Sequence, residues 1–500
     1  MKRQIIKNIS ANFLNLIVSI FIGLLLTPLL VNKLGMEVYG VLPIALFLTF
    51  YMGVIAQSLT ASVNRFLIHE FINGEYIDAS VIFSTSFVLI LSYLSLISLI
   101  LIYPILHISQ FLNIPHGYEH DAVLLFTCVL ISFIIAMISS SLSVSIYAKN
   151  RIDLMQCGNI IRNITKLLFV IFYIYISNIN LANIGLAIVF SEIGYLVFII
   201  ICWKLLTPQL NLSLRLFRKE KVKKITSFSG WVLFDQIGSI LFLKTDLILV
   251  NSLSGSKANG EYSIATQFSD LLRSLAGLVA GSLGPMMVIL YEKKQFEELT
   301  SLTITFVKFL SFTIAVPIII LCVYSKEILN WWLGPEYTHL SYLIFIVTLP
   351  LIINLGTLPI LSINIAVKKI QIPAIVNCLL AIVGIVTSII LFRNSTLGYY
   401  AIAICYVITL TIKNAIFIPW YATKILNKPR YVFFKTHLMT LVFSTFLLIF
   451  VFAFKHYVVM LNLNLLFQLV IIGALGLFLT FFFYSKEERN SFVSMLRRKI

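Results

Sequence analysis

Ten ionisable residues lie inside long apolar stretches of this sequence, where charged side chains are rare and costly. The cations are Arg162, Lys166, Lys244, Arg273, Lys308 and Lys413, and the acids are Glu192, Asp235, Asp246 and Asp270. Guanidinium and ammonium groups can replace the water that a phosphate loses when it leaves solution, so the surplus of cations suits an anionic head group. The candidate residues of a substrate cavity are Arg162, Lys166, Arg273, Lys308 and Lys413.

Arg162 and Lys166 share one face of a predicted helix with Asn159 and Asn163, because neighbours on a helix face recur every three or four residues. Two cations on one face repel each other. An anion must therefore approach them, and it is either a substrate or an acid such as Glu192.

The cations of the second half differ in their neighbours. Asp270 precedes Arg273 by three residues and can neutralise it, whereas Lys308 and Lys413 have no acid nearby on their own helices. Lys308 and Lys413 are therefore open to an external anion.

Two acids are candidates for carrying a coupling proton or sodium ion, namely Glu192 and Asp235. A hydrogen-bonded, structural role is the alternative for Glu192. Asp246 and Lys244 lie near the predicted outer end of their helix and are expected to reach water. Arg65 ends the second apolar stretch, where we predict the cytoplasmic entrance.

No metal or cofactor is expected. The six cysteines are scattered singly, without a CxxC pair or a histidine-spaced set, and no Walker loop appears. The net charge of +17 suggests nucleic acid or an anionic membrane as a partner. Nothing resembles a nucleic-acid-binding module, so membrane lipid is the expected partner.

The elements that position these residues must be membrane helices. The chain is 60% hydrophobic and 11% charged, with a mean hydropathy of +1.00, which excludes a soluble enzyme. We predict an all-α polytopic membrane protein with about fourteen transmembrane helices. The predicted spans are 9–31, 38–62, 80–105, 122–148, 154–176, 183–206, 227–251, 261–290, 301–324, 340–365, 373–392, 398–424, 437–456 and 464–484.

The spans group into two six-helix lobes, 1–206 and 227–424, joined by a cytoplasmic connection at 207–226. Two additional helices (425–484) and a cytoplasmic tail (485–500) follow. Most of the 37 Lys and Arg residues fall on one side of these spans, which predicts that both termini face the cytoplasm.

A weak internal repeat supports the two lobes. The stretch from Thr27 to Gly35 at the end of the first span parallels the stretch from Thr245 to Gly255 at the end of the seventh. Tyr39-Gly40 follows the first and Gly260-Glu261-Tyr262 the second. Both spans run in the same direction, so the repeats are expected to be parallel.

Several separated motifs resemble the polysaccharide flippases of the multidrug, oligosaccharidyl-lipid and polysaccharide exporter superfamily. They are Asn8 to Asn15 with Thr27-Pro28 and Tyr39-Gly40, Ser58 to Phe66 with its boundary Arg65, and Lys244-Thr245-Asp246 through Gly260 to Ala265. One departure is Ile55-Ala56-Gln57, where the family usually has an Asp-Leu-Gly-like step.

The resemblance implies a flippase in the bacterial cytoplasmic membrane that moves a polyprenyl-pyrophosphate-linked oligosaccharide outward for cell-surface polysaccharide biosynthesis. Alternating access coupled to an ion gradient is expected, with a polysaccharide polymerase and glycosyltransferases as possible partners. Multidrug and peptidoglycan-precursor exporters of the same superfamily are the close alternatives. A membrane polymerase or ligase of lipid-linked sugars is disfavoured because the predicted outer loops are too short for a catalytic unit.

Overall fold

The computed structural model describes residues 2–49, 53, 67, 70–71, 73–176, 179–281, 283–367, 369, 371–459 and 464–484. Most of these residues are helical, and no strand occurs among them. They include eleven helices long and apolar enough to cross a membrane, or twelve if the bent pair Gln236–Phe242 and Lys244–Gly281 is one span. The all-α membrane architecture is as predicted.

The predicted number of about fourteen spans is not confirmed. Of the second predicted span, 38–62, the structure describes residues 38–49 and 53, and the rest lies outside the described residues. The seventh span and most of the eighth fall within the single long element α10 (Lys219–Gly281). Gly255 interrupts α10 with non-helical angles, φ 86° and ψ 177°, so α10 is physically two helices.

By backbone contacts the chain divides into unit 1, Met1–Ser263, and unit 2, Ile264–Ile500. Residues 207–263 thus belong to unit 1, and the predicted lobes 1–206 and 227–424 stay a prediction. The predicted cytoplasmic tail, 485–500, lies outside the described residues.

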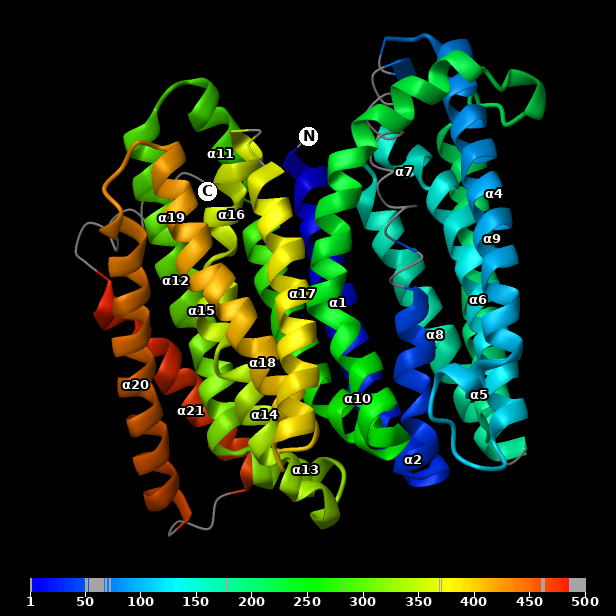
Figure 1. Ribbon diagram of the computed structural model, residues 1–500. Helices are drawn as coiled ribbons and strands as arrows, with labels where there is room; N and C mark the ends of the chain where they lie inside the picture. The colour runs from blue at the N-terminus through cyan, green and yellow to red at the C-terminus, as the bar shows by residue number, and fades with distance from the viewer. Residues whose placement is uncertain are drawn as a thin grey trace. The chain divides into compact units, whose positions relative to one another are not determined.

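Unit 1 combines long helices with short helical segments (Figure 1). In chain order its helices before α10 are α1 (Lys2–Leu34), α2 (Met36–Tyr39), α4 (Tyr76–Leu106), α5 (Ile108–Phe111), α6 (Glu119–Leu142), α7 (Val144–Ala148), α8 (Ile152–Ile176) and α9 (Leu181–Leu206). Helix α9 packs on both α6 and α8, and α8 packs on α1. The α6–α9 contact is tight, because a methyl group on Gly185 would lie 2.8 Å from Cys128 Cβ. Helix α8 is thereby held between α1 and α9.

Unit 2 is arranged around α12 (Phe296–Val323), which packs against seven other helices of the unit. Five of the seven are α14 (Ser341–Thr348), α15 (Leu351–Gly356), α16 (Leu358–Ala366), α20 (Tyr431–Val459) and α21 (Leu465–Thr480). Helices α14 to α16 occupy the single span predicted at 340–365. Pro350 starts α15, where its missing N–H cannot continue the preceding helix.

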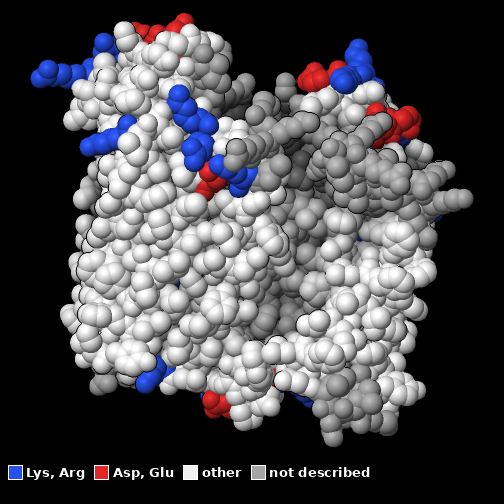
Figure 2. Space-filling view, turned by 180° about the vertical axis from the view of Figure 1, so that it is seen from behind, with Lys and Arg blue, Asp and Glu red and all other residues white. Residues whose placement is uncertain are grey.

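The remaining helices of unit 2 are α11 (Gly284–Glu292), α13 (Ser325–Trp332), α17 (Gln371–Asn394), α18 (Tyr399–Thr411) and α19 (Ile418–Ile425). A π-helical turn, η3 (Ile412–Phe417), joins α18 to α19. On the face seen in Figure 2, charged side chains gather towards the helix ends, and the band between them is almost uncharged. Such a band suits contact with lipid.

Candidate functional site

The best-defined ionisable cluster lies on α8 and α9 of unit 1. Arg162 Nη1 is 3.3 Å from Glu192 Oε1, and the Arg162 guanidinium carbon lies 5.1 Å from the centroid of the Tyr195 ring. Lys166, one turn further along α8, interacts electrostatically with both charged groups. The sequence analysis predicted that either a substrate or an acid such as Glu192 approaches this face. In the structure, Glu192 is the anion that contacts Arg162.

The three charges of this cluster do not balance. Arg162 and Lys166 carry two positive charges against the one negative charge of ionised Glu192. The Glu192 side chain is only 12% exposed, and its Oε2 atom has no hydrogen-bond partner among the described residues. With all three groups ionised, the cluster carries one surplus positive charge in a largely desolvated setting.

Polar side chains on α1 hold the α8 face of this cluster in place. Asn15 Nδ2 donates to Gln156 Oε1 at 2.9 Å, and Asn159 Nδ2 donates to the same oxygen at 3.2 Å. Asn163 Nδ2 donates to Ser19 Oγ at 2.9 Å. The Asn15 and Asn163 contacts position α8 against α1, whereas Asn159 bonds to Gln156 within α8.

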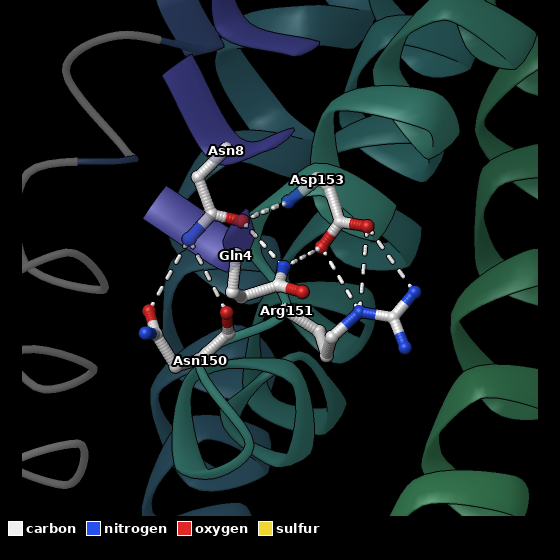
Figure 3. A network of polar contacts seen from close by, with 5 residues as sticks. All are labelled: Gln4, Asn8, Asn150, Arg151 and Asp153. Atoms are coloured by element: carbon white, nitrogen blue, oxygen red, sulfur yellow. Dashed lines mark hydrogen bonds and ion pairs between the residues drawn. The ribbon is translucent and has the colours of Figure 1, made fainter. Parts of the chain in front are cut away.

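A second polar network ties the start of α1 to the start of α8 (Figure 3). Gln4 Nε2 donates to Asp153 Oδ1 at 2.7 Å, and the Asp153 backbone N–H donates to Asn8 Oδ1 at 3.0 Å. Asn8 Nδ2 reaches the carbonyl and side-chain oxygens of Asn150, both at 3.2 Å. Arg151 Nε completes the network with Asp153 Oδ1 at 3.1 Å.

The sequence analysis missed this network. A usable signal was present, because Gln4 and Asn8 are four residues apart on one helix face and Asp153 stands in the first turn of another helix.

In unit 2, Lys413 lies in the π-helical turn η3, and its Nζ donates to Asn377 Oδ1 on α17 at 2.9 Å. The turn is held by neighbours: Thr357 Oγ1 donates to the Asn414 carbonyl at 3.1 Å, and Asn414 Nδ2 donates to Asn354 Oδ1 at 3.3 Å. Turns of this kind often occur at functional sites. The sequence predicted the cation but not the turn that presents it.

The other predicted site residues are spread over both units. Arg273 lies on α10 after Gly255, Lys308 lies on α12, and both are half-buried. Arg65 lies outside the described residues, and so does the side chain of Asp235 on α10. The structure thus brings together Arg162, Lys166 and Glu192 in unit 1.

The prediction that Asp246 reaches water is wrong. Asp246 is only 6% exposed, and its Oδ2 accepts a hydrogen bond of 2.9 Å from the Tyr262 hydroxyl. The hydroxyl comes from the helix after Gly255, whose kink folds that helix back towards Asp246. This acid is therefore a structural one.

The two predicted repeat motifs meet in unit 1 at a close contact that we call the glycine clasp, formed by residues 36–40 and 256–260. Asn259 Nδ2 donates to the Gly40 carbonyl at 2.7 Å. A methyl group on Gly40 would lie 1.9 Å from the Ser256 carbonyl oxygen, and one on Gly260 would lie 2.7 Å from the Met36 carbonyl oxygen. Only glycine permits this approach.

Each half of the glycine clasp follows a glycine with positive φ. The values are 76° at Gly35 and 86° at Gly255, and each glycine starts a new helix. The repeat seen in the sequence thus has the same local geometry in both copies.

Comparisons with known proteins agree with this architecture. A family model described as "Polysaccharide biosynthesis protein" matches residues 33–342. The uncharacterized membrane protein EpsK of Bacillus subtilis is 30% identical over 440 residues, covering 86% of this chain and 85% of the relative. A putative O-antigen transporter of Shigella flexneri is 24% identical over 383 residues, covering 75% of this chain and 88% of the relative.

Solved structures share the fold. An inward-facing multidrug resistance MATE family transporter of the MOP superfamily has a TM-score of 0.70 at 14% identity, covering 84% of this chain and 98% of that chain. The lipid II flippase MurJ in an inward closed conformation has a TM-score of 0.67 at 17% identity. That match covers 97% of this chain and 99% of that chain.

Proposed function

Because the chain belongs to the polysaccharide biosynthesis protein family, we propose that it is a flippase for a polyprenyl-pyrophosphate-linked oligosaccharide. It would move this lipid from the inner to the outer leaflet of the bacterial cytoplasmic membrane for cell-surface polysaccharide biosynthesis. Support comes from the likeness to a putative O-antigen transporter and from the fold shared with a lipid II flippase. Glycosyltransferases would supply the substrate, and a polymerase would use it on the other side.

The observation that carries the proposal is the surplus positive charge of Arg162 and Lys166 beside Glu192. A pyrophosphate that enters a desolvated site loses its hydration, and charge-assisted hydrogen bonds must replace it. The planar guanidinium of Arg162 can donate two parallel hydrogen bonds, and the ammonium group of Lys166 is a compact positive charge. Together they suit an anion with several oxygens. The prenyl chain would stay in lipid while alternating access of the predicted lobes 1–206 and 227–424 moves the head group.

Coupling to an ion gradient has two candidate groups, Glu192 and Asp235. In the structure, ionised Glu192 holds Arg162, so protonation of Glu192 frees the guanidinium and strengthens anion binding. In an antiporter driven by an inward proton gradient, protonation must instead weaken substrate binding, because the proton competes with the substrate. Glu192 therefore suits a structural role in this pair, and Asp235 is the better candidate for the coupling ion.

The alternatives within the superfamily differ in the charge that their site must hold. A site for cationic drugs would be expected to carry surplus negative charge, whereas the cluster on α8 and α9 carries surplus positive charge. A peptidoglycan precursor is also a pyrophosphate-linked lipid, so the same cluster suits it, and the fold match to the lipid II flippase covers 97% of this chain. Transport of a peptidoglycan precursor is therefore the second candidate function.

Complementation in two strains separates these functions. The full chain is expressed in a strain that lacks its surface-polysaccharide flippase and in a strain depleted of its lipid II flippase. We expect surface polymer to return in the first strain, with loss of the lipid-linked oligosaccharide that accumulates inside. Growth rescue of the second strain alone would favour the peptidoglycan precursor and contradict the proposal.

A further inference from the structure

A basic pocket of about 380 Å³ opens in unit 2 where two membrane helices end. Its lining residues are Lys369, Gln371, Ile372, Tyr421, Lys424 and Ile425. Gln371 and Ile372 form the first turn of the span Gln371–Asn394, and residues 421–425 are the last turn of the span Tyr399–Ile425. The pocket therefore lies at the level where the hydrocarbon gives way to lipid head groups.

The charges around the pocket favour an anion. Lys369 and Lys424 bring two ammonium groups from separate segments, and the first free backbone N–H groups of the 24-residue helix α17 add the positive end of its dipole. The Tyr421 hydroxyl donates to the Lys369 carbonyl at 3.5 Å, which ties the two sides of the pocket together. Among the residues that the structure describes, no acidic side chain lines the pocket.

The surface below the pocket is apolar and exposed. A stripe on α17 begins inside the pocket and continues at three- and four-residue steps: Ile372 (51% exposed), Ile375 (42%), Leu379 (57%), Ile382 (51%), Val386 (49%) and Ile390 (54%). Acyl chains can lie along this stripe while a phosphate occupies the pocket. A soluble anion would use the lysines but not the stripe.

We propose that this pocket binds the phosphate of an anionic phospholipid, with Lys369 and Lys424 as its ligands and the α17 stripe as its acyl contact. The site is separate from the cluster on α8 and α9, and the proposal does not depend on what the protein transports. Basic pockets between helices at a membrane surface commonly recognise lipid head groups in this way.

Trp420 provides a reporter, because the Lys424 Nζ atom lies 5.5 Å from its ring centroid. The full-length protein is placed in phosphatidylcholine vesicles that contain increasing fractions of brominated phosphatidylglycerol, a quencher of tryptophan fluorescence. Subtracting the signal of Trp420→Phe isolates the contribution of Trp420. We expect quenching to saturate at a lower fraction of brominated phosphatidylglycerol than of brominated phosphatidylcholine. Each lysine should lower the fraction that is needed by about fivefold.

Paired variants test the two lysines. Lys369→Gln with Lys424→Gln is expected to abolish the preference for phosphatidylglycerol. The matched control, Lys293→Gln with Lys294→Gln, removes two exposed lysines outside the pocket and should keep the preference. Equal quenching by the two brominated lipids in the unmodified protein would overturn the proposal.

Inorganic phosphate distinguishes a lipid from a soluble anion. We expect millimolar phosphate in the buffer to leave the lipid quenching curve almost unchanged, because a soluble ion gains nothing from the α17 stripe. If phosphate alone changes Trp420 fluorescence and no preference for phosphatidylglycerol exists, the pocket takes a free anion and the lipid assignment is wrong.

Discussion

Lys166 and Lys413 present their charges in different surroundings. Lys166 shares the single negative charge of Glu192 with Arg162, and Lys413 donates to the neutral amide oxygen of Asn377. Removing either charge should leave the packing intact, because Gln can keep part of the polar contact. Both cations remain predicted ligands of an anionic substrate.

We therefore expect Lys166→Gln and Lys413→Gln each to lower export about tenfold or more, since a charge-assisted hydrogen bond contributes about 1.5–3 kcal/mol. Surface polymer is measured in a flippase-deficient strain at matched membrane abundance. Lys204→Gln, which removes an exposed cation at the end of α9, serves as the control. Normal export from both test variants would show that these charges do not hold the substrate.

The Arg162–Glu192 pair should respond unequally to loss of its two members. Arg162→Gln leaves the carboxylate of Glu192, 12% exposed, without the cation of its ion pair and with only the longer-range interaction with Lys166. Glu192→Gln leaves Arg162, which is 33% exposed and still lies over Tyr195. Stranding the more buried charge costs more, so we expect Arg162→Gln to be the more destabilising change by about 1–3 kcal/mol.

Melting temperatures of the purified variants in detergent measure this difference. The double variant should recover part of the loss, because it contains no stranded carboxylate, and the double-mutant cycle gives the coupling energy. Equal melting temperatures for the two single variants would mean that Glu192 finds another partner.

At the scale of elements, the glycine clasp joins the helix starts that follow Gly35 and Gly255. Gly40→Ala places a methyl group 1.9 Å from the Ser256 carbonyl oxygen, so the two backbone segments must separate. Overpacking of this kind costs about 1–3 kcal/mol. Gly277→Ala is a matched control, because a methyl group there meets nothing within 4 Å.

The test is the thermal stability of the two purified variants. We expect Gly40→Ala to melt at a lower temperature than the unmodified protein and Gly277→Ala to melt at the same temperature or higher, since Ala favours a helix over Gly. A stable Gly40→Ala protein would indicate that the contact is easily relaxed.

The sequence predicted the long apolar helices well, because hydropathy over about 20 residues depends on composition alone. It also predicted the face of α8 that carries Arg162 and Lys166, since helical periodicity fixes which residues share a face. It could not choose between Glu192 and a substrate as the nearest anion. The answer depends on how α8 and α9 pack, and the residue pattern within one helix carries no information about that packing.

Breaks within helices were harder to predict. The π-helical turn at Lys413 and the burial of Asp246 by Tyr262 both arise from contacts between segments, with Thr357 and with the helix after Gly255. Local propensity describes neither contact. The repeat in the sequence contains a glycine at both kinks, Gly35 and Gly255, where the backbone has a positive φ.

At the scale of the whole molecule, the distribution of charge predicts the orientation in the membrane. Lys and Arg concentrate in the connections between helices on one side of the predicted spans, and charged side chains in Figure 2 lie mainly towards the helix ends. Cytoplasmic loops retain positive charge because such loops are translocated poorly. The basic segment 215–224 and the C-terminal residues 497–499 should therefore both face the cytoplasm.

Alkaline phosphatase fusions test this orientation, since the enzyme is active only after export to the oxidising outer side. We expect a fusion after Lys224 and a fusion at the C-terminus to be inactive, and a fusion at Pro335 to be active. Pro335 lies in the connection between α13 and α14, on the side where few Lys or Arg residues are predicted. Replacing the cations of segment 215–224 with Gln should weaken the bias and raise activity of the fusion after residue 224. If that fusion is already active in the unmodified chain, the positively charged connections lie outside, and the proposed direction of transport has to be reversed.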